Sequence, residues 1–227
     1  MDGQLTPLCV GELSSAIKHL EYAKAEDLII YDRGYPSFQL IFEHYRQNID
    51  FVIRGKKDFN NQILAFYESG KTTEIVEIYP GKNTKISDKE YNYKTAQTVR
   101  LVRVELSSGE SEILITSLLD HKKYPSELFK NLYFKRWGVE TFYDEFKNKL
   151  KAEHFSGYSK HSILQDFNVA LFVSNIQSLI VGEINDELQT NTKTKYVYKV
   201  NNNLSYGLLK DRIVTLFYSE TKSEVIF

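Results

Sequence analysis

The spacing of apolar residues in the first part of the chain predicts alternating helices and strands. Residues 12–25 repeat apolar side chains every three or four positions, as the buried face of a helix does. Residues 27–32 and 50–54 are instead short and almost continuously apolar. A run like 27–32 is typical of a strand that is covered on both faces in a parallel sheet. Ser37 can cap a helix between the two strands, so the pattern indicates an α/β fold.

Between residues 56 and 120 the pattern changes to an alternation of apolar and polar positions. Three runs, at 73–79, 98–106 and 111–119, alternate in this way and are typical of strands. The segment 107–110, Ser-Ser-Gly-Glu, predicts a turn between the last two. We therefore expect a β-rich insertion in the α/β pattern.

Helical spacing returns after Pro125. Residues 126–150 predict one continuous helix, and a second long helix is expected over 162–188. A polar linker at 190–199 and a last short helix at 204–217 follow. The apolar positions that we expect to form the buried face of the first of these helices are Leu128, Leu132, Val139, Phe146 and Leu150.

Charge and composition narrow the class of protein. The net charge of the 227 residues is −1, which by itself argues against a nucleic-acid-binding protein. However, residues 121–151 hold eight basic and four acidic side chains, a local excess of +4 that suits phosphate binding. The single cysteine excludes an internal disulfide and fits a reducing compartment. The most apolar stretch, 169–181, is interrupted by polar residues, and we expect a cytoplasmic protein without a membrane span.

Four residues with side chains suited to phosphate chemistry share one side of the predicted helix 126–150. On ideal helical geometry, Tyr133, Arg136, Glu140 and Lys147 form a narrow stripe roughly 21 Å long, apart from the apolar face. A simpler interpretation is a solvated helix face in which Arg136 and Glu140 form an ordinary i, i+4 ion pair. Periodicity alone leaves both interpretations open.

The spacing Tyr-x2-Arg-x3-Glu-x6-Lys resembles the signature of bacterial insertion-sequence transposases, in the family founded by insertion sequence four. Segments 32–37, 153–157, 198–201 and 207–212 also resemble segments of that family. The first of them, Asp-Arg-Gly-Tyr-Pro-Ser, follows the predicted strand 27–32 and resembles the family's second acidic motif. The resemblance spans nearly the whole chain.

The resemblance implies a ribonuclease-H-like, retroviral-integrase-like core in which three carboxylates hold divalent metal. Asp32 would be the second carboxylate and Glu140 the third, with two Mg²⁺ or Mn²⁺ ions as cofactors. The partners would be DNA, namely the terminal inverted repeats of the insertion sequence and the target. The residues expected to contact DNA are Tyr133, Arg136, Lys147, Arg33 and Arg54; for Arg54 a place in a solvated loop is equally compatible with the sequence.

The family often stacks an aromatic side chain of the β-rich insertion on a displaced DNA base. The insertion here has no tryptophan. Four tyrosines could replace it, although packing is an alternative for each: Tyr67, Tyr79, Tyr91 and Tyr93.

The family's first carboxylate lies upstream of the helix that we expect at 12–25, and only eleven residues precede that helix. We therefore expect an N-terminally truncated copy that lacks the first Asp and the first strands. Its metal site would be incomplete, its strand 27–32 would expose an edge, and it would be inactive without a complementing fragment or a second copy. The alternative is an inactive DNA-binding or self-associating fragment.

Four parts are expected along the chain, in a protein associated with the bacterial nucleoid. They are a core remnant with the second Asp at 1–55, the β-rich insertion at 56–120, the Glu helix with the following core helix at 121–190, and a C-terminal segment at 191–227.

Overall fold

The computed structural model describes residues 3–7, 9–82, 84, 86, 90–106, 109–191 and 198–218. The chain divides into two compact units. We call Thr6–Gly138 the sheet unit, and Met1–Leu5 together with Val139–Phe227 the helical unit. Each is described by itself.

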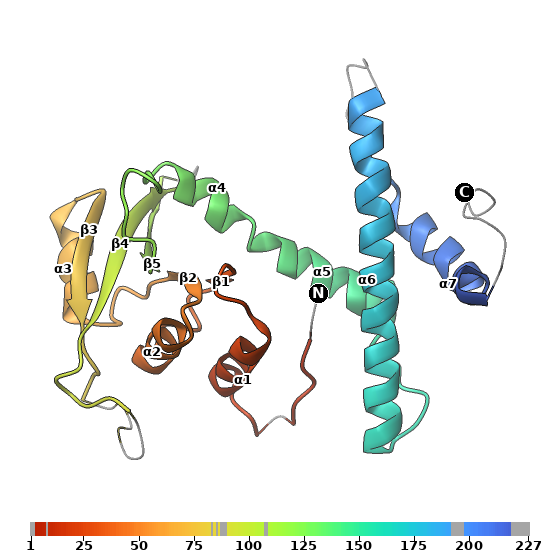
Figure 1. Ribbon diagram of the computed structural model, residues 1–227, viewed down its shortest axis with the longest axis horizontal. Helices are drawn as coiled ribbons and strands as arrows, with labels where there is room; N and C mark the ends of the chain where they lie inside the picture. Colours follow the sequence, from red (N-terminus) through yellow and green to blue (C-terminus); the bar gives the residue numbers. More distant parts are fainter. Residues whose placement is uncertain are drawn as a thin grey trace. The chain divides into compact units, whose positions relative to one another are not determined.

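The sheet unit is built on one mixed sheet of five strands in the order β1-β2-β5-β4-β3 (Figure 1). Strands β1 and β2 are parallel, and every other neighbouring pair is antiparallel. Segment 56–120 therefore supplies three strands of the same sheet that contains the two N-terminal strands. The strands are β1 (Leu28–Tyr31), β2 (Asp50–Arg54), β3 (Thr73–Ile78), β4 (Gln97–Glu105) and β5 (Ser111–Thr116).

The predicted strands are confirmed within a few residues, and so are the first two helices. The side chain of Ser37 accepts a hydrogen bond of 3.0 Å from the Leu40 amide and caps α2, as expected. One helix, α3, was not predicted because its nine residues lie inside the alternating region; Asn60 caps it through the Ile63 amide. The predicted turn residues Ser107 and Ser108 lie outside the described residues. The helices are α1 (Glu12–His19), continued by a 3₁₀ turn (Leu20–Tyr22), α2 (Phe38–Gln47), α3 (Asn61–Ser69) and α4 (Leu128–Phe134).

The two faces of the sheet are covered by different helices. Alternation along β2 directs Phe51 and Ile53 to the face packed by α1, α2 and α3, and Val52 to the face packed by α4. All three side chains are fully buried. The expected cover on both faces is confirmed only in part for β1: Ile29 packs on one face and Leu28 and Ile30 on the other, but all three are only half-buried. The reason is position, since β1 is at the end of the sheet and β2 is inside it.

The single helix expected over 126–150 is also wrong. Helix α4 ends at Phe134 and α5 (Trp137–Asn148) begins three residues later. Amides of Lys135, Arg136 and Gly138 bond to carbonyls three residues earlier, so the backbone tightens between the two helices. The ideal-helix stripe is therefore interrupted between Tyr133 and Glu140.

The assignment of faces on this segment changes as well. Tyr133 is buried against the sheet with Phe129, one helical turn before it. Leu128 and Val139, expected in the core, are about half-exposed. The aromatic side chains Phe129 and Tyr133, at positions i and i+4, are therefore the ones that pack against the sheet.

The helical unit contains most of α5 together with α6 (Lys160–Asn191) and α7 (Asn202–Tyr218). Helices α6 and α7 pack around Val173, Tyr206 and Leu209. Residues 192–197, in the expected linker, lie outside the described residues. The 32-residue α6 is longer than predicted, and its span Lys160–Leu188 is long and apolar enough to cross a membrane. That is weak evidence, because core helices of soluble proteins pass the same test.

Arg100 of β4 is fully buried and ties the sheet to the segment that leads into α4. Its guanidinium donates to the carbonyl oxygens of Tyr124 (2.6 Å) and Leu118 (3.4 Å) and to the side-chain oxygens of Ser126 (3.0 Å) and Thr73 (2.9 Å). Burial lowers the pKa of Arg100, and the charges of Asp120 and Glu127 counteract that fall. One side chain thus satisfies four acceptors, one on β3 and three in the segment between β5 and α4.

Replacing this side chain should destabilise the sheet unit. Arg100→Met keeps much of the volume but leaves buried carbonyl oxygens without a donor, at an expected cost of about 3 kcal/mol in the free energy of unfolding. Urea unfolding followed by circular dichroism measures it. The matched control, Arg46→Met, removes a solvated ion pair with Glu43 and should leave the urea midpoint nearly unchanged. Equal midpoints for Arg100→Met and the parent protein would contradict the anchoring role.

Candidate functional site

A pocket of about 580 Å³ opens where the parallel strands β1 and β2 end. Tyr31, the last residue of β1, pairs with Ile53, so Asp32 directly after β1 and Arg54 at the end of β2 follow at the same edge of the sheet. The carboxyl ends of parallel strands are where α/β proteins generally bind ligands. The residues that line the pocket are Asp32, Arg33, Gly34, Arg54, Gly55, Lys56, Lys57, Asp58, Tyr67, Ser111, Glu112 and Ile113.

The carboxylate of Asp32 is held by the turn that follows β1. Its Oδ1 accepts a hydrogen bond of 2.6 Å from the amide of Gly34. A Cβ added at Gly34 would lie only 2.9 Å from that oxygen, so a larger residue would displace the carboxylate. Asp32 is half-buried and lines the pocket, while Arg33 beside it is exposed.

Cationic side chains surround this carboxylate. Four basic residues line the pocket, Arg33, Arg54, Lys56 and Lys57, against three acidic ones. Arg54 bonds to Glu112 at 2.5 Å, and the Lys57 ammonium lies 4.2 Å from the centre of the Tyr67 ring. Each of these two contacts holds a cation at the pocket wall.

Tyr133 and Arg136 lie in the same unit as the pocket. The Arg136 guanidinium is 5.8 Å from the centre of the Tyr133 ring and 4.7 Å from that of Trp137. Burial raises the pKa of Tyr133, and the positive charges of Arg136 and Arg54 oppose that rise. Arg54 lines the pocket, and its charge also acts on Tyr133, the first residue of the sequence motif.

Glu140 and Lys147 belong to the helical unit, where both are exposed on α5. Seven residues are about two turns of helix, so the two side chains share one side of α5, about 10 Å apart along its axis. The Lys147 ammonium is 2.9 Å from a carboxylate oxygen of Glu153, which raises the pKa of Lys147. The expected motif is thus shared between the two units.

Residues 10–176 match the family model described as the transposase DDE domain. The chain belongs to the transposase DDE domain family. No curated protein matches the sequence. Members of this family catalyse DNA transposition by phosphoryl transfer and generally use divalent metal ions. The five-stranded mixed sheet with helices on both faces is consistent with their ribonuclease-H-like fold. The match includes Asp32 and Glu140 and ends within α6, so α7 lies outside it.

The metal implied by the DDE family needs several oxygen ligands. Among the described residues, no three His, Cys, Asp or Glu side chains converge on one point. In the sheet unit the carboxylate of Glu112 is bound to Arg54, and the other neighbours of Asp32 are mainly cations. The pocket of this DDE domain therefore fits a phosphate group next to the carboxylate of Asp32. It does not by itself make a complete metal site.

The structure separates the four candidate tyrosines of this DDE domain. Tyr67 lines the pocket, Tyr91 is buried in the core, and Tyr79 and Tyr93 are exposed away from the pocket-lining residues. Glu112 was not among the predicted site residues, whereas Tyr67 was one of four candidates and the pair Lys56-Lys57 could contact the DNA backbone or lie in a solvated loop. Only the lysine pair, directly after a strand, carries a recognisable signal in the sequence.

A buried histidine holds the strand end that leads to Asp32. His44 is fully buried; its Nδ1 donates to the carbonyl oxygen of Ile49 (2.9 Å), which leaves Nε2 to accept from the Tyr31 hydroxyl (3.0 Å). Burial lowers the pKa of His44 despite the carbonyl of Ile49 and the charge of Asp50, which raise it. Tyr31, the residue before Asp32, is thus fixed from α2.

Because His44 is buried with a lowered pKa, the free energy of unfolding should depend on pH. Because the folded-state pKa of His44 is below the unfolded value of about 6.5, the unfolded chain binds the proton first as the pH falls. The contribution of neutral His44 to the free energy of unfolding should be complete above about pH 6.5 and should decline below it. Urea midpoints at neutral and mildly acidic pH measure how much stability is lost as the pH falls. This loss should be smaller in His44→Gln. Equal losses in the two proteins would contradict the assignment.

Proposed function

We propose that the chain supplies the second and third catalytic carboxylates of a transposase of the insertion-sequence-four family. Asp32 is the second and Glu140 the third, and the reaction is phosphoryl transfer on DNA at the ends of an insertion sequence. The observation that carries the proposal is the pocket at the ends of β1 and β2, where Asp32 lies among Arg33, Arg54 and two lysines. A carboxylate among cations suits a reacting phosphodiester.

The residues divide into two roles in this proposal. Asp32 and Glu140 would hold Mg²⁺ or Mn²⁺, which when bound activates the attacking oxygen and stabilises the leaving one. Arg33 and Arg54 bind phosphate oxygens, for which the planar guanidinium is well suited. Arg136 and Lys147 extend the contact along the DNA, and Tyr133 supports Arg136 through its ring.

We further propose that another strand adds beside β1. Among the described residues β1 has a strand on one side only, and its apolar residues 28–30 are half-buried. A parallel strand on the open side would end next to Asp32 and could bring the missing carboxylate. A complementing fragment would supply it. The four expected parts of the chain, with the insertion at 56–120, remain our description of this transposase.

The alternative function is DNA binding or self-association without chemistry. It is favoured by one observation: among the described residues no three His, Cys, Asp or Glu side chains converge on one point, and Asp32 lies mainly among cations. DNA binding that depends on the cations, without nicking even when the adjoining strand is supplied, would favour this alternative.

Catalysis should require the added strand. In Mg²⁺ or Mn²⁺ we expect the purified chain to nick DNA carrying the terminal repeats no faster than Asp32→Ala, because its carboxylate set is incomplete. Nicking should appear when the adjoining strand is supplied as a second polypeptide, and should then be lost in Asp32→Ala and Glu140→Ala. Gel analysis of labelled DNA measures it.

The control for catalysis is Asp58→Ala, which removes another carboxylate from the same pocket and should keep the activity. Nicking by the wild-type chain alone that disappears in Asp32→Ala would show that the carboxylate set is already sufficient. Nicking that persists in Asp32→Ala under every condition would exclude Asp32 from the reaction.

DNA binding should depend on the pocket cations. The double variant Arg33→Gln, Arg54→Gln should lower the slope of log affinity against log salt by about 2, since each lost phosphate contact removes roughly 0.9. Arg136→Ala with Lys147→Ala should weaken binding further, whereas Glu140→Ala should leave it intact. Fluorescence anisotropy over a salt series measures these slopes.

The matched control carries Lys18→Gln and Arg46→Gln, which remove two cations from α1 and α2 of the same unit. Its salt slope should equal that of the parent protein. If both double variants lose the same slope, the DNA contact is general attraction to the chain and does not involve the pocket.

A further inference from the structure

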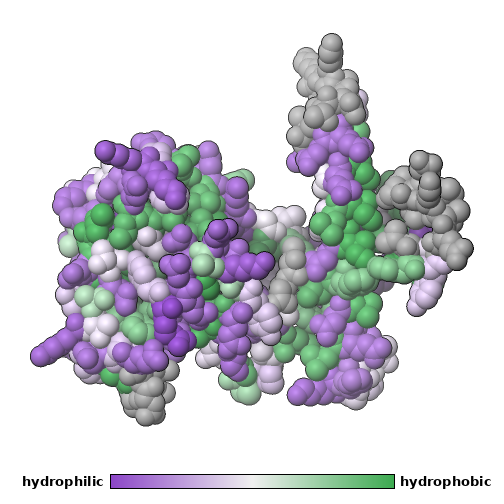
Figure 2. All heavy atoms as spheres, in the orientation of Figure 1, coloured by the Kyte–Doolittle hydropathy of each residue, from purple (hydrophilic) through white to green (hydrophobic). Residues whose placement is uncertain are grey.

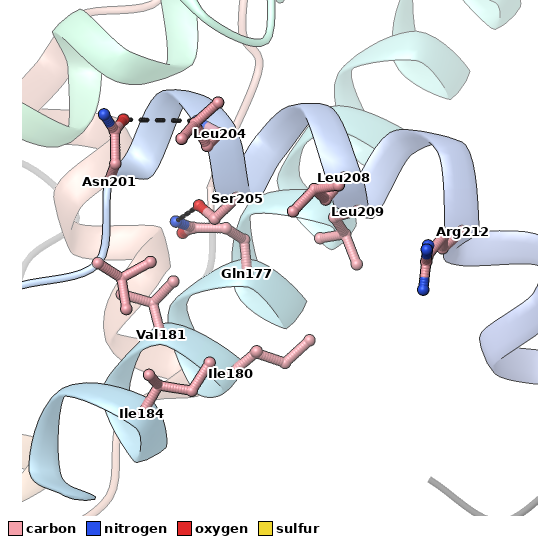
Figure 3. A pocket seen from close by; sticks show the side chains of 11 residues that line it. Gln177, Ile180, Val181, Ile184, Asn201, Leu204, Ser205, Leu208, Leu209 and Arg212 are labelled. Atoms are coloured by element: carbon pink, nitrogen blue, oxygen red, sulfur yellow. Dashed lines mark hydrogen bonds between the residues drawn. The ribbon is translucent and has the colours of Figure 1, made fainter. Parts of the chain in front are cut away.

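The pocket beside Asp32 differs in chemistry from the groove between α6 and α7. Figure 2 shows hydrophobic residues along the column of α6, and the groove of about 250 Å³ beside this helix is mainly apolar (Figure 3). Arg212 is the one charged residue among the described ones that line the groove, and Gln177 is already bonded to the Ser205 hydroxyl at 2.8 Å. The pocket beside Asp32 is instead lined by four basic and three acidic residues. The side chains suited to ionic ligands are therefore gathered in the sheet unit.

Three neighbouring strands each bring one charged residue to this pocket. Strands β1, β2 and β5 are neighbours in that order. Asp32 follows β1, Arg54 ends β2, and Glu112 is the second residue of β5. Because β5 is antiparallel to β2, the beginning of β5 lies at the same edge of the sheet as the end of β2. The guanidinium of Arg54 therefore comes from the strand between those of the two carboxylates.

The ion pair of Arg54 with Glu112 lies on the face of the sheet that α4 covers. Val52 packs against α4, and side chains alternate along a strand, so Arg54 two residues later is directed to the same face. Leu114 packs there too, so Glu112, two residues before it, is also directed to α4. The two charges meet at 2.5 Å, with side chains 29% and 9% exposed, and both act on the pKa of buried Tyr133. This shielding from water strengthens their attraction.

The carboxylate of Asp32 is not drawn into this ion pair. Its Oδ1 accepts from the Gly34 amide, and among the described residues no ion pair joins Asp32 to Arg54, although both line the pocket. Opposite charges at the ends of neighbouring strands attract each other, so a stronger partner must hold Arg54. Glu112 is that partner, because a nearly buried carboxylate needs a counter-charge more than the half-buried carboxylate of Asp32 does.

We propose that Glu112 is a positioning residue that holds Arg54 away from Asp32. This role rests on the proposed function, in which Asp32 binds a divalent cation and Arg54 binds phosphate. A guanidinium paired with Asp32 would compete with the cation for the same carboxylate oxygens. Glu112 binds Arg54 through Nη2, which leaves the other N–H groups of the guanidinium for phosphate oxygens. Glu112 thus keeps the carboxylate and the guanidinium of the site apart, each for its own ligand.

Binding of Mn²⁺ alone to the full chain tests the proposal without DNA or catalysis. Mn²⁺ broadens nearby nuclear magnetic resonance signals, and the Gly34 amide reports on Asp32 because it donates to that carboxylate. We expect broadening of this signal in the wild-type chain and not in Asp32→Ala. In Glu112→Ala the Mn²⁺ concentration at half-broadening should rise roughly threefold to fivefold, because Arg54 then pairs with Asp32 and a partly exposed ion pair has about that strength.

A double-variant cycle separates positioning from simple loss of charge. Removing any negative charge from the pocket weakens cation binding, whether or not Arg54 is present. Positioning acts only through Arg54, so in the Arg54→Gln background Glu112→Ala should raise the half-broadening concentration no more than the matched control Asp58→Ala does. Glu112→Gln keeps an oxygen that accepts from Arg54 and should give an intermediate value in the wild-type background. It also replaces Glu112→Ala if circular dichroism shows that the alanine variant is not folded.

Three outcomes contradict the positioning role. An equal effect of Glu112→Ala with and without Arg54 shows that only its charge acts. No effect of either Glu112 variant shows that Arg54 stays away from Asp32 without help. A Gly34 signal that Mn²⁺ broadens no more in the wild-type chain than in Asp32→Ala shows that the carboxylate is not available to the cation. The nicking and DNA-binding experiments are separate, so an effect of Glu112→Ala that depends on Arg54 stands even if the proposed function fails.

Discussion

The parallel pairing of β1 with β2 is the constraint on which the site of this DDE domain depends. Tyr31, the last residue of β1, lies opposite Ile53, and β2 ends one residue later at Arg54. Asp32 and Arg54 therefore follow at the same edge of the sheet, and a carboxylate and a guanidinium line one pocket. A shift of one residue in this register would turn the side chains of β1 to the opposite faces and separate the pair. The buried centre of β2, Phe51 to Ile53, resists such a shift.

Buried polar residues keep this arrangement in place from both sides of the sheet. His44 holds Tyr31 from the face covered by α1 and α2. On the face covered by α4, Arg100 binds the loop that precedes α4, and this helix in turn places Tyr133 where the charge of Arg54 reaches it. Polar groups buried in this way are stable only when all partners are present, so they define one geometry.

The division of the chain changes how the helical motif should be understood. Tyr133 and Arg136 belong to the sheet unit, whereas Glu140 and Lys147 belong to the helical unit. The tight turn between α4 and α5 falls between the two pairs. The spacing of the motif is therefore a property of two helices and the turn that joins them, and an ideal straight helix does not describe it.

The sequence determined the local elements and the family. Strands β1 and β2, the Ser37 cap and the segment around Asp32 follow from short-range patterns, because burial and capping act over a few residues. The spacing from Tyr133 to Lys147 indicated a DDE transposase, and the match over 10–176 confirms that coarser assignment. Tertiary structure alone decided that β5 pairs with β2, that Tyr133 is buried, and that Tyr67 and Glu112 reach the pocket. These depend on contacts between residues far apart in the chain, which local periodicity does not encode.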